Sequence, residues 1–354
     1  MPKIGQIRGM LLEEALLHLL RGSGYRTVEA VNNDETLKAG AAGLLVKGRG
    51  GNHQIDAIAD FLVSQPFSHP QRLLVEAKCY SNKVRLPVVR NAVGVLKDVS
   101  EYWVPESSHV PAKRRYHYQY ALFSASGYTK DSERYAFAQD INLIPLAHSR
   151  FLSPVLDAIR SFSEQDFDTA PSDNISLRMS SLRQAIRNRL KNDDYSERDN
   201  FSERPLLRER FDRFITACYQ INYAIIATIR GGFPVFLVPS PGVSVDSLGS
   251  SLDVRIFWDS AGWYLRNLNG EELFSFDLPP ALFLLYAQEG ILSRRRALDL
   301  KEQAMSEFQA ISTRRGDVRI ITFHLDEGWI VYVRERLERQ IRFEDDEPEM
   351  RNSE

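Results

Sequence analysis

Segments with helical spacing alternate with short apolar runs across residues 11–146. Apolar residues recur every three or four positions in 11–20, 88–102 and 130–139, which is the spacing of an amphipathic helix. The intervening runs are too short for helices and are typical of strands; they lie at 25–31, 44–46, 55–63, 73–77, 118–124 and 141–146. Helices that connect strands must cover the faces of a sheet, so this order predicts a three-layer α/β domain with a mixed central sheet.

The length and composition bound what else the chain contains. Its 354 residues suffice for about two domains, and the 43% hydrophobic and 26% charged fractions are those of a globular protein. No apolar run approaches the roughly 18 residues that cross a bilayer, and the first residues lack the apolar core of a signal peptide. Cys79 and Cys218 cannot form a disulfide framework or a zinc cluster, so we expect a cytoplasmic protein with no membrane partner.

We interpret residues 1–160 as one domain and 161–204 as a charged linker with one helix at 177–190. Residues 205–345 predict a strand-rich α+β domain, which serves recognition, dimerisation or regulation, and 346–354 form an acidic tail. The predicted strands of this domain lie at 223–229, 235–238, 254–258, 263–268, 273–276, 318–323 and 329–333, and its helices at 282–285 and 298–308. Residues 1–160 carry about +5 net charge and the remainder about −7, which gives weak support for a polyanion on the first domain.

Two charged residues, Glu76 and Lys78, stand at the end of the apolar run Leu73-Leu74-Val75. Side chains alternate along a strand, so both point to the same face. Asp56 belongs to the preceding strand, where pairing would bring its carboxylate beside Glu76. Two convergent carboxylates suit a magnesium ion, and a lysine beside them is placed to orient or deprotonate an attacking water.

A glutamate and a lysine two residues apart on a strand usually form only a solvated face. The position of Glu76 and Lys78 favours a functional interpretation, because charges at the end of a buried strand are costly unless they are paired or used. The glycine-rich run 48–51, just before Asp56, also allows close approach of a backbone or a ligand.

Five short segments occur in a recognisable order around these residues. They are Leu12-Glu13 with Gly24-Tyr25, the run 50–56 that ends at Asp56, the run 75–80 around Glu76 and Lys78, the run 123–136, and Ile141-Asn142-Leu143-Ile144. In this order the sequence resembles the PD-(D/E)XK nuclease superfamily, and more closely its Mrr-like restriction endonuclease branch. The resemblance covers about 135 residues and implies a restriction-endonuclease-like fold.

The resemblance also implies an activity, namely the hydrolysis of DNA phosphodiester bonds with a divalent metal ion. By this resemblance Asp56 and Glu76 would hold Mg²⁺, with Mn²⁺ as a substitute and the backbone carbonyl of Ala77 as a further ligand. Lys78 would act on the nucleophilic water, and Glu13 would support the metal site from the first helix. The neighbouring Glu14 is then expected to face solvent.

Several polar residues outside this centre are candidates for contacts with nucleic acid. His53 and Gln54 lie in the turn before Asp56, and Arg90 lies on the helix that follows the core strand. A basic and aromatic cluster at 113–118 is suited to gripping phosphates or stacking on a base, and its basic members are Lys113, Arg114 and Arg115. For each of them an ordinary solvated side chain is the competing interpretation.

The sequence thus favours a Mg²⁺-dependent endodeoxyribonuclease of restriction or defence type. Two alternatives stay open: a structure-specific or RNA-directed nuclease with the same centre, and a non-cleaving nucleic-acid-binding subunit that retains the fold. DNA is the expected partner, and cutting two strands with one centre per chain would favour a homodimer. The chain has no nucleotide-binding Walker loop, so any ATPase would be a separate chain.

Overall fold

A computed structural model describes residues 3–40, 43–63, 66–103, 115–147, 149, 151–167, 179–191, 205–221, 223–259, 262–287, 293–314 and 317–350. The chain divides into two compact units, each of which is described by itself. The first comprises residues 1–224 with 313–318, and the second comprises residues 225–312 with 319–354.

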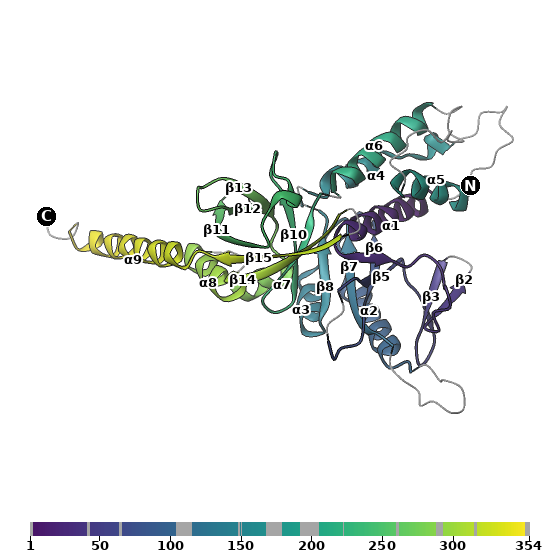
Figure 1. Cartoon of the computed structure of the whole chain (residues 1–354), viewed down its shortest axis with the longest axis horizontal. Coiled ribbons are helices and arrows are strands. Elements are labelled where there is room, and N and C mark those ends of the chain that lie inside the picture. The colour runs from purple at the N-terminus through teal and green to yellow at the C-terminus, as the bar shows by residue number, and fades with distance from the viewer. Residues whose placement is uncertain are drawn as a thin grey trace. The chain divides into compact units, whose positions relative to one another are not determined.

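A mixed five-stranded sheet forms the centre of the first unit, in the order β1-β5-β6-β7-β8. Its strands β5 to β8 are labelled in Figure 1. β5 is antiparallel to β1 and β6, while β6, β7 and β8 run parallel to one another. The strands are β1 (Tyr25–Thr27), β5 (Ala57–Phe61), β6 (Gln71–Lys78), β7 (His117–Ser124) and β8 (Ile141–Pro145). β6 has a partner on both sides, as the apolar run before Glu76 predicted, and this confirms the mixed sheet.

Helices cover both faces of this sheet and complete the three layers. α1 (Ile4–Gly22) packs against β1, β5 and β6. α2 (Leu86–Ser100) and α3 (Lys130–Ala138) pack against β7 and β8. Leu74, Tyr120 and Leu122 of the sheet share a buried core cluster with Val89 and Val95 of α2. Since alternate residues of a strand face opposite sides, Glu76 and Lys78 stand on the same side of β6 as Leu74.

A separate antiparallel sheet, β2-β3-β4, lies between β1 and β5 in the chain. Its strands are β2 (Leu37–Gly40), β3 (Gly43–Lys47) and β4 (Asn52–Gln54). Only the run at 44–46 was predicted here, because β2 and β4 are short and mostly exposed and so lack an apolar pattern. Its buried residues Leu37 and Val46 join the same core cluster as Leu74.

The segment interpreted as a linker contains regular structure that belongs to the first unit. α4 (Ser153–Ser161), a 3₁₀ turn (Glu164–Phe167), α5 (Met179–Lys191) and α6 (Pro205–Ile221) follow the sheet. The predicted helix at 177–190 corresponds to α5, which packs against α1 and α6. The domain boundaries drawn from the sequence stay a prediction.

A closed barrel forms the second unit, in the strand order β10-β13-β12-β11-β15-β14-β9. The strands are β9 (Ile225–Ile229), β10 (Phe233–Pro239), β11 (Ser251–Asp259), β12 (Gly262–Arg266), β13 (Glu272–Phe276), β14 (Glu307–Arg314) and β15 (Asp317–Leu325). Ile256, Leu265, Phe274 and Phe323 are among its buried core residues. α7 (Pro280–Tyr286), α8 (Arg294–Met305) and α9 (Glu327–Met350) accompany the barrel.

Two sequence predictions in the second unit were wrong. The run 329–333 is not a strand but the start of α9, where the Trp329 N–H donates to Oδ1 of Asp326 at 3.0 Å. An aspartate that accepts from the first turn begins a helix despite the β-forming residues that follow. The helix predicted at 298–308 ends at Met305, because Glu307 already begins β14.

α9 also extends to Met350, into the predicted acidic tail, whereas residues 351–354 lie outside the described part of the chain. Within the described residues, no helix combines the length and the apolar character needed to cross a membrane.

Candidate active site

Asp56 lies just before β5, where the chain enters the central sheet from β4. The first residue of β5, Ala57, pairs with Val75 of β6, which brings Asp56 next to the last residues of β6. The backbone N–H of Ala77 donates to Oδ2 of Asp56 at 2.8 Å. The strand pairing that the sequence predicted therefore places Asp56 against the Glu76-Ala77-Lys78 segment.

Glu76 and Lys78 form an ion pair on one side of β6. Lys78 contacts Oε1 of Glu76, and the hydroxyl of Tyr120 on β7 donates to Oε2. Only 15% of the Glu76 side chain and 18% of the Lys78 side chain are exposed, so water screens this pair weakly. Both oxygens of Glu76 are thus engaged by the protein itself.

Burial sets the protonation of the neighbouring groups. It raises the pKa of Asp56 above its usual range, although the Ala77 N–H and the charge of Lys78 act in the opposite direction. Burial alone would lower the pKa of Lys78, but the hydrogen bond and charge of Glu76 outweigh it and raise that pKa. In this arrangement Lys78 is a charged donor at neutral pH.

Glu13 of α1 and Asp56 line one cavity of about 760 Å³. Burial raises the pKa of Glu13 to about 7, although Arg183 of α5 lowers it; the charge of Asp56 adds to the rise. The Arg183 guanidinium donates to Oε2 of Glu13 at 2.7 Å. The helix residue expected beside the metal site therefore shares the cavity with Asp56 and is paired with an arginine from another helix.

Glu14, expected to face solvent, is only 1% exposed, and that expectation was wrong. Arg187 of α5 donates from two nitrogens to the Glu14 carboxylate, at 2.8 and 2.9 Å. α5 covers this side of α1 and supplies the counter-charge that makes the burial tolerable. The sequence predicts the helix at 177–190 but contains no pattern that places it against α1.

The two candidates before Asp56 lie in different surroundings. Gln54 is exposed and lines the same cavity as Asp56. His53, on β4, instead contacts Asp98 of α2 at 2.6 Å, and the N–H of Gly50 donates to the same carboxylate. The histidine lowers the pKa of Asp98. His53 and the glycine-rich turn thus contact α2 through Asp98, and His53 does not line the cavity that holds Asp56.

The two basic candidates that the structure describes, Arg90 and Arg115, do not line the Asp56 cavity. Arg90 is exposed on α2 and stands 5.8 Å from the ring centre of Tyr135. Arg115 pairs with Glu35 at 3.3 Å, while Lys113 and Arg114 lie outside the described residues. A role for any of them in nucleic-acid binding stays a prediction.

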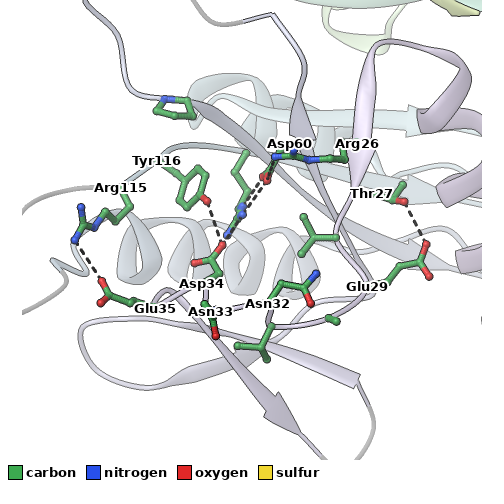
Figure 2. Close-up of a pocket in the computed structure, with 15 residues that line it drawn as sticks. Arg26, Thr27, Glu29, Asn32, Asn33, Asp34, Glu35, Asp60, Arg115 and Tyr116 are labelled. Carbon is green, nitrogen blue, oxygen red and sulfur yellow. Dashed lines mark hydrogen bonds and ion pairs between the residues drawn. The ribbon is translucent and has the colours of Figure 1, made fainter. Parts of the chain in front are cut away.

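Arg115 lines a second cavity, of about 640 Å³, shown in Figure 2. Arg72, at the start of β6, is its most buried charge, with 1% of the side chain exposed. It donates to both oxygens of Asp60 and contacts Asp34 at 2.8 Å. Its guanidinium also lies 3.6 Å from the ring centre of Tyr116. The charge of Arg72 is thus compensated by Asp34 and Asp60, as expected of a structural network.

The residues around Asp56 meet the chemical needs of a hard divalent cation. Two carboxylates, of Asp56 and Glu76, and the backbone carbonyl of Ala77 are oxygen donors, and Mg²⁺ takes few protein ligands because it keeps several waters. No group of three or more His, Cys, Asp or Glu within the described residues is arranged to hold a metal ion. The donor set fits Mg²⁺ once Glu76 exchanges its contact with Lys78 for the cation.

Comparison with known proteins identifies the first part of the chain. Residues 5–148 match the Mrr_cat family, described as restriction endonuclease. These residues form a restriction endonuclease domain. The match covers α1 through β8 and includes Asp56, Glu76 and Lys78, and it confirms the resemblance seen in the sequence.

The chain was also compared with curated proteins and with solved structures. No curated relative matches the chain. Among solved structures, the chain is similar to a protein of unknown function, AF1548, at 15% identity and a TM-score of 0.34, over 60% of this chain and 97% of the other. The restriction endonuclease domain therefore rests on the family match.

Two residues of the site were missed by sequence reasoning. Tyr120 stands opposite Leu74 in the register of β6 and β7, one strand away from Glu76. The available signal was a polar aromatic at the start of the apolar run 120–123. Arg183 had no signal, because it lies 170 residues from Glu13 and in a segment of linker-like composition.

Proposed function

We propose that the restriction endonuclease domain hydrolyses DNA phosphodiester bonds with Mg²⁺, in restriction or defence. The observation that carries the proposal is the hydrogen bond from the Ala77 N–H to Asp56. It holds the carboxylate of Asp56, just before β5, beside the carboxylate and the lysine at the end of β6, which is the donor set that metal-assisted hydrolysis needs.

In this proposal Asp56, Glu76 and the Ala77 carbonyl hold Mg²⁺, and Mn²⁺ substitutes for it. A bound ion would act as a Lewis acid on the phosphate oxygens. The remaining tasks belong to the chain. Asp56 is oriented by the Ala77 N–H, and the Tyr120 hydroxyl holds one oxygen of Glu76 while the other is released from Lys78.

Lys78 orients the attacking water and stabilises the negative charge that develops on the phosphate. As the chain stands, Glu76 raises the pKa of Lys78 and keeps it charged. When Glu76 turns to the cation, the largest cause of that rise is removed. Burial would then favour the neutral amine, so Lys78 would lose its own proton more easily and the free amine could accept one from the water.

Glu13 supports the centre from α1. Its raised pKa, about 7, means that it exchanges a proton in the neutral range. It shares a cavity with Asp56, so its carboxyl is placed to hold a water or a proton near the reacting phosphate. The second unit is proposed to serve target recognition, dimerisation or regulation. Cutting both strands would then engage two copies of the chain in a homodimer.

Cleavage of supercoiled plasmid by the full chain tests the proposal. The wild type should nick or linearise the plasmid with Mg²⁺ or Mn²⁺ and not with EDTA. Asp56→Ala and Lys78→Ala should lose at least about 100-fold in rate, the loss typical of a missing metal ligand or general base. The exposed residues Asp131 and Lys83 provide matched controls, and Asp131→Ala and Lys83→Ala should cut like the wild type. Equal nicking by Asp56→Ala and the wild type would refute the proposal.

Two further measurements separate the alternatives. Parallel assays with linear duplex, branched DNA, single-stranded DNA and RNA distinguish an ordinary endodeoxyribonuclease from a structure-specific or RNA-directed one. Calorimetric titration with Mg²⁺ and Mn²⁺, with and without DNA, distinguishes a nuclease from a binding subunit. Absence of metal uptake in both titrations would favour the binding subunit.

A further inference from the structure

Helix α5 brings two arginines to the cavity that holds Glu13 and Asp56. Arg183 and Arg187 stand four residues apart on α5, so they occupy one face of the helix, and both line the cavity. α5 lies beyond residues 5–148, so these arginines are additions to the restriction endonuclease domain.

The two arginines differ in how fully their donors are used. Arg187 directs its Nε and one terminal nitrogen to the buried Glu14, and its other terminal nitrogen stands 3.6 Å from Glu29. Arg183 makes a single hydrogen bond, to Glu13, and stands at a looser 3.4 Å from Glu14. The guanidinium group has five N–H donors, so most of those of Arg183 are uncommitted among the described residues.

A phosphate could enter this cavity only if a positive side chain offset the charge of its acidic residues. Glu13 and Asp56 line it, and each repels the backbone of a nucleic acid while it is ionised and not bound to a cation. Arg187 is neutralised by Glu14, which is 1% exposed and fixed in place. Arg183 is the more exposed of the two, at 26% against 19% of the side chain, and it lines the same cavity as the acids.

We propose that Arg183 is a phosphate-binding residue of this cavity, which exchanges part of its contact with Glu13 for a phosphate of the DNA backbone beside the cleavage site. The proposal rests on the proposed nuclease function and deepens it. A guanidinium binds a phosphate through two parallel hydrogen bonds, so Arg183 fixes the position of the backbone relative to Asp56. Arg187 has a structural role, which is to compensate Glu14.

DNA affinity at several salt concentrations tests the assignment. Anisotropy of a labelled duplex is measured with the full chain and Ca²⁺ for the wild type, Arg183→Gln, Arg183→Lys and Arg208→Gln. Loss of one phosphate contact should reduce the slope of log affinity against log salt by about 1 in Arg183→Gln. Arg183→Lys should keep the slope, because it keeps the charge. Arg208 is an exposed arginine of α6 outside the cavity, and Arg208→Gln should match the wild type.

A footprint on the wild-type protein provides a measurement that does not depend on a variant. Arginine-selective modification by phenylglyoxal is followed by peptide mass spectrometry, with and without duplex DNA. DNA should slow the modification of Arg183 and leave that of Arg208 unchanged. Equal modification of Arg183 in the two states would overturn the proposal even if Arg183→Gln failed to fold.

The remaining outcomes are equally decisive. An unchanged salt slope in Arg183→Gln would overturn the proposal. Tighter binding or faster cleavage by that variant would overturn it too, because Arg183 would then block the cavity. If the wild type bound no DNA, the proposed nuclease function would fail together with the role of Arg183. If the wild type bound and cut DNA and Arg183→Gln behaved identically, only the role of Arg183 would fail.

Discussion

The backbone N–H of Ala77 donates to Oδ2 of Asp56 at 2.8 Å, across the junction between β5 and β6. This contact joins the acid that precedes one strand to the charged end of the next. Asp56 lies in the bend just before β5, and the pairing of Ala57 with Val75 brings its carboxylate within reach of the Ala77 N–H. Asp56 thus carries a negative charge and also accepts a hydrogen bond, and a substitution by asparagine removes the first and keeps the second.

Asp56→Asn should abolish cleavage and leave the fold intact, because an amide oxygen still accepts from the Ala77 N–H. Asp56→Ala should abolish cleavage as well and also lower the free energy of unfolding by about 1 kcal/mol, since it leaves that N–H without its acceptor. Urea unfolding of both variants beside the wild type measures the difference. Equal stability of the two variants would mean that the hydrogen bond contributes nothing to the fold.

Tyr120→Phe removes the hydroxyl that holds one oxygen of Glu76 and leaves the buried ring in place. We expect the turnover rate kcat to fall by about tenfold at saturating Mg²⁺, because Glu76 loses its orientation. KM for DNA should not change, since Tyr120 does not line the cavity with Asp56. A change in KM alone would assign Tyr120 to substrate binding instead.

Arg187→Met leaves the Glu14 carboxylate buried and paired only with the more distant Arg183. The free energy of unfolding should fall by about 2 kcal/mol, as expected when one partner of a buried ion pair is removed. Adding Glu14→Gln should recover part of this loss, because no buried charge is then left uncompensated. A double-mutant cycle in urea measures the coupling, and strictly additive effects would contradict the assigned pair.

Lys301 of α8 is 8% exposed, and its ammonium lies 5.8 and 5.2 Å from the ring centres of Trp263 and Trp329. Burial lowers its pKa from 10.5 to about 8. The unfolded chain therefore binds more protons between pH 8 and 10.5, so this group makes the second unit more stable as pH rises through that window. At pH 7 the buried charge opposes folding.

Lys301→Met should stabilise the second unit at pH 7 by on the order of 2 kcal/mol and remove the rise in stability above pH 8. Tryptophan fluorescence is a suitable probe, since three of the four tryptophans, at 258, 263 and 329, belong to this unit. A variant that is less stable than the wild type at pH 7 would show that contacts of Lys301 with the indole rings outweigh the cost of its burial.

The central part of the site could be predicted because it depends on local pattern. The alternation of side chains places Glu76 and Lys78 on one face, and the pairing of consecutive strands brings Asp56 beside them. The alternation of helical and strand segments likewise predicts the mixed sheet and the helices that cover it. Contacts that join distant segments have no such pattern. The sequence therefore predicts an exposed Glu14, whereas Arg187, 173 residues away, covers it in the structure.

The errors in the second unit have local physical causes. Trp329, Val331 and Val333 favour strands by their intrinsic preference, but Asp326 accepts from the next turn and begins a helix, with Ile330 buried on its inner face. The first residues of β14, 307–308, were taken for the end of a helix, and the rest of the strand was not predicted, because Phe308, Ala310 and Ser312 alternate over too few residues to stand out.

Single-turnover cleavage of a labelled DNA duplex, measured against Mg²⁺ concentration for the wild type and Asp56→Asn, tests whether Asp56 holds the catalytic ion. The wild-type rate should rise with Mg²⁺ to a plateau and vanish in EDTA. Asp56→Asn, folded and able to bind the duplex, should stay at least about 100-fold slower at every concentration. Wild-type cleavage that persists in EDTA, or a folded Asp56→Asn that cuts as fast as the wild type, would contradict that role.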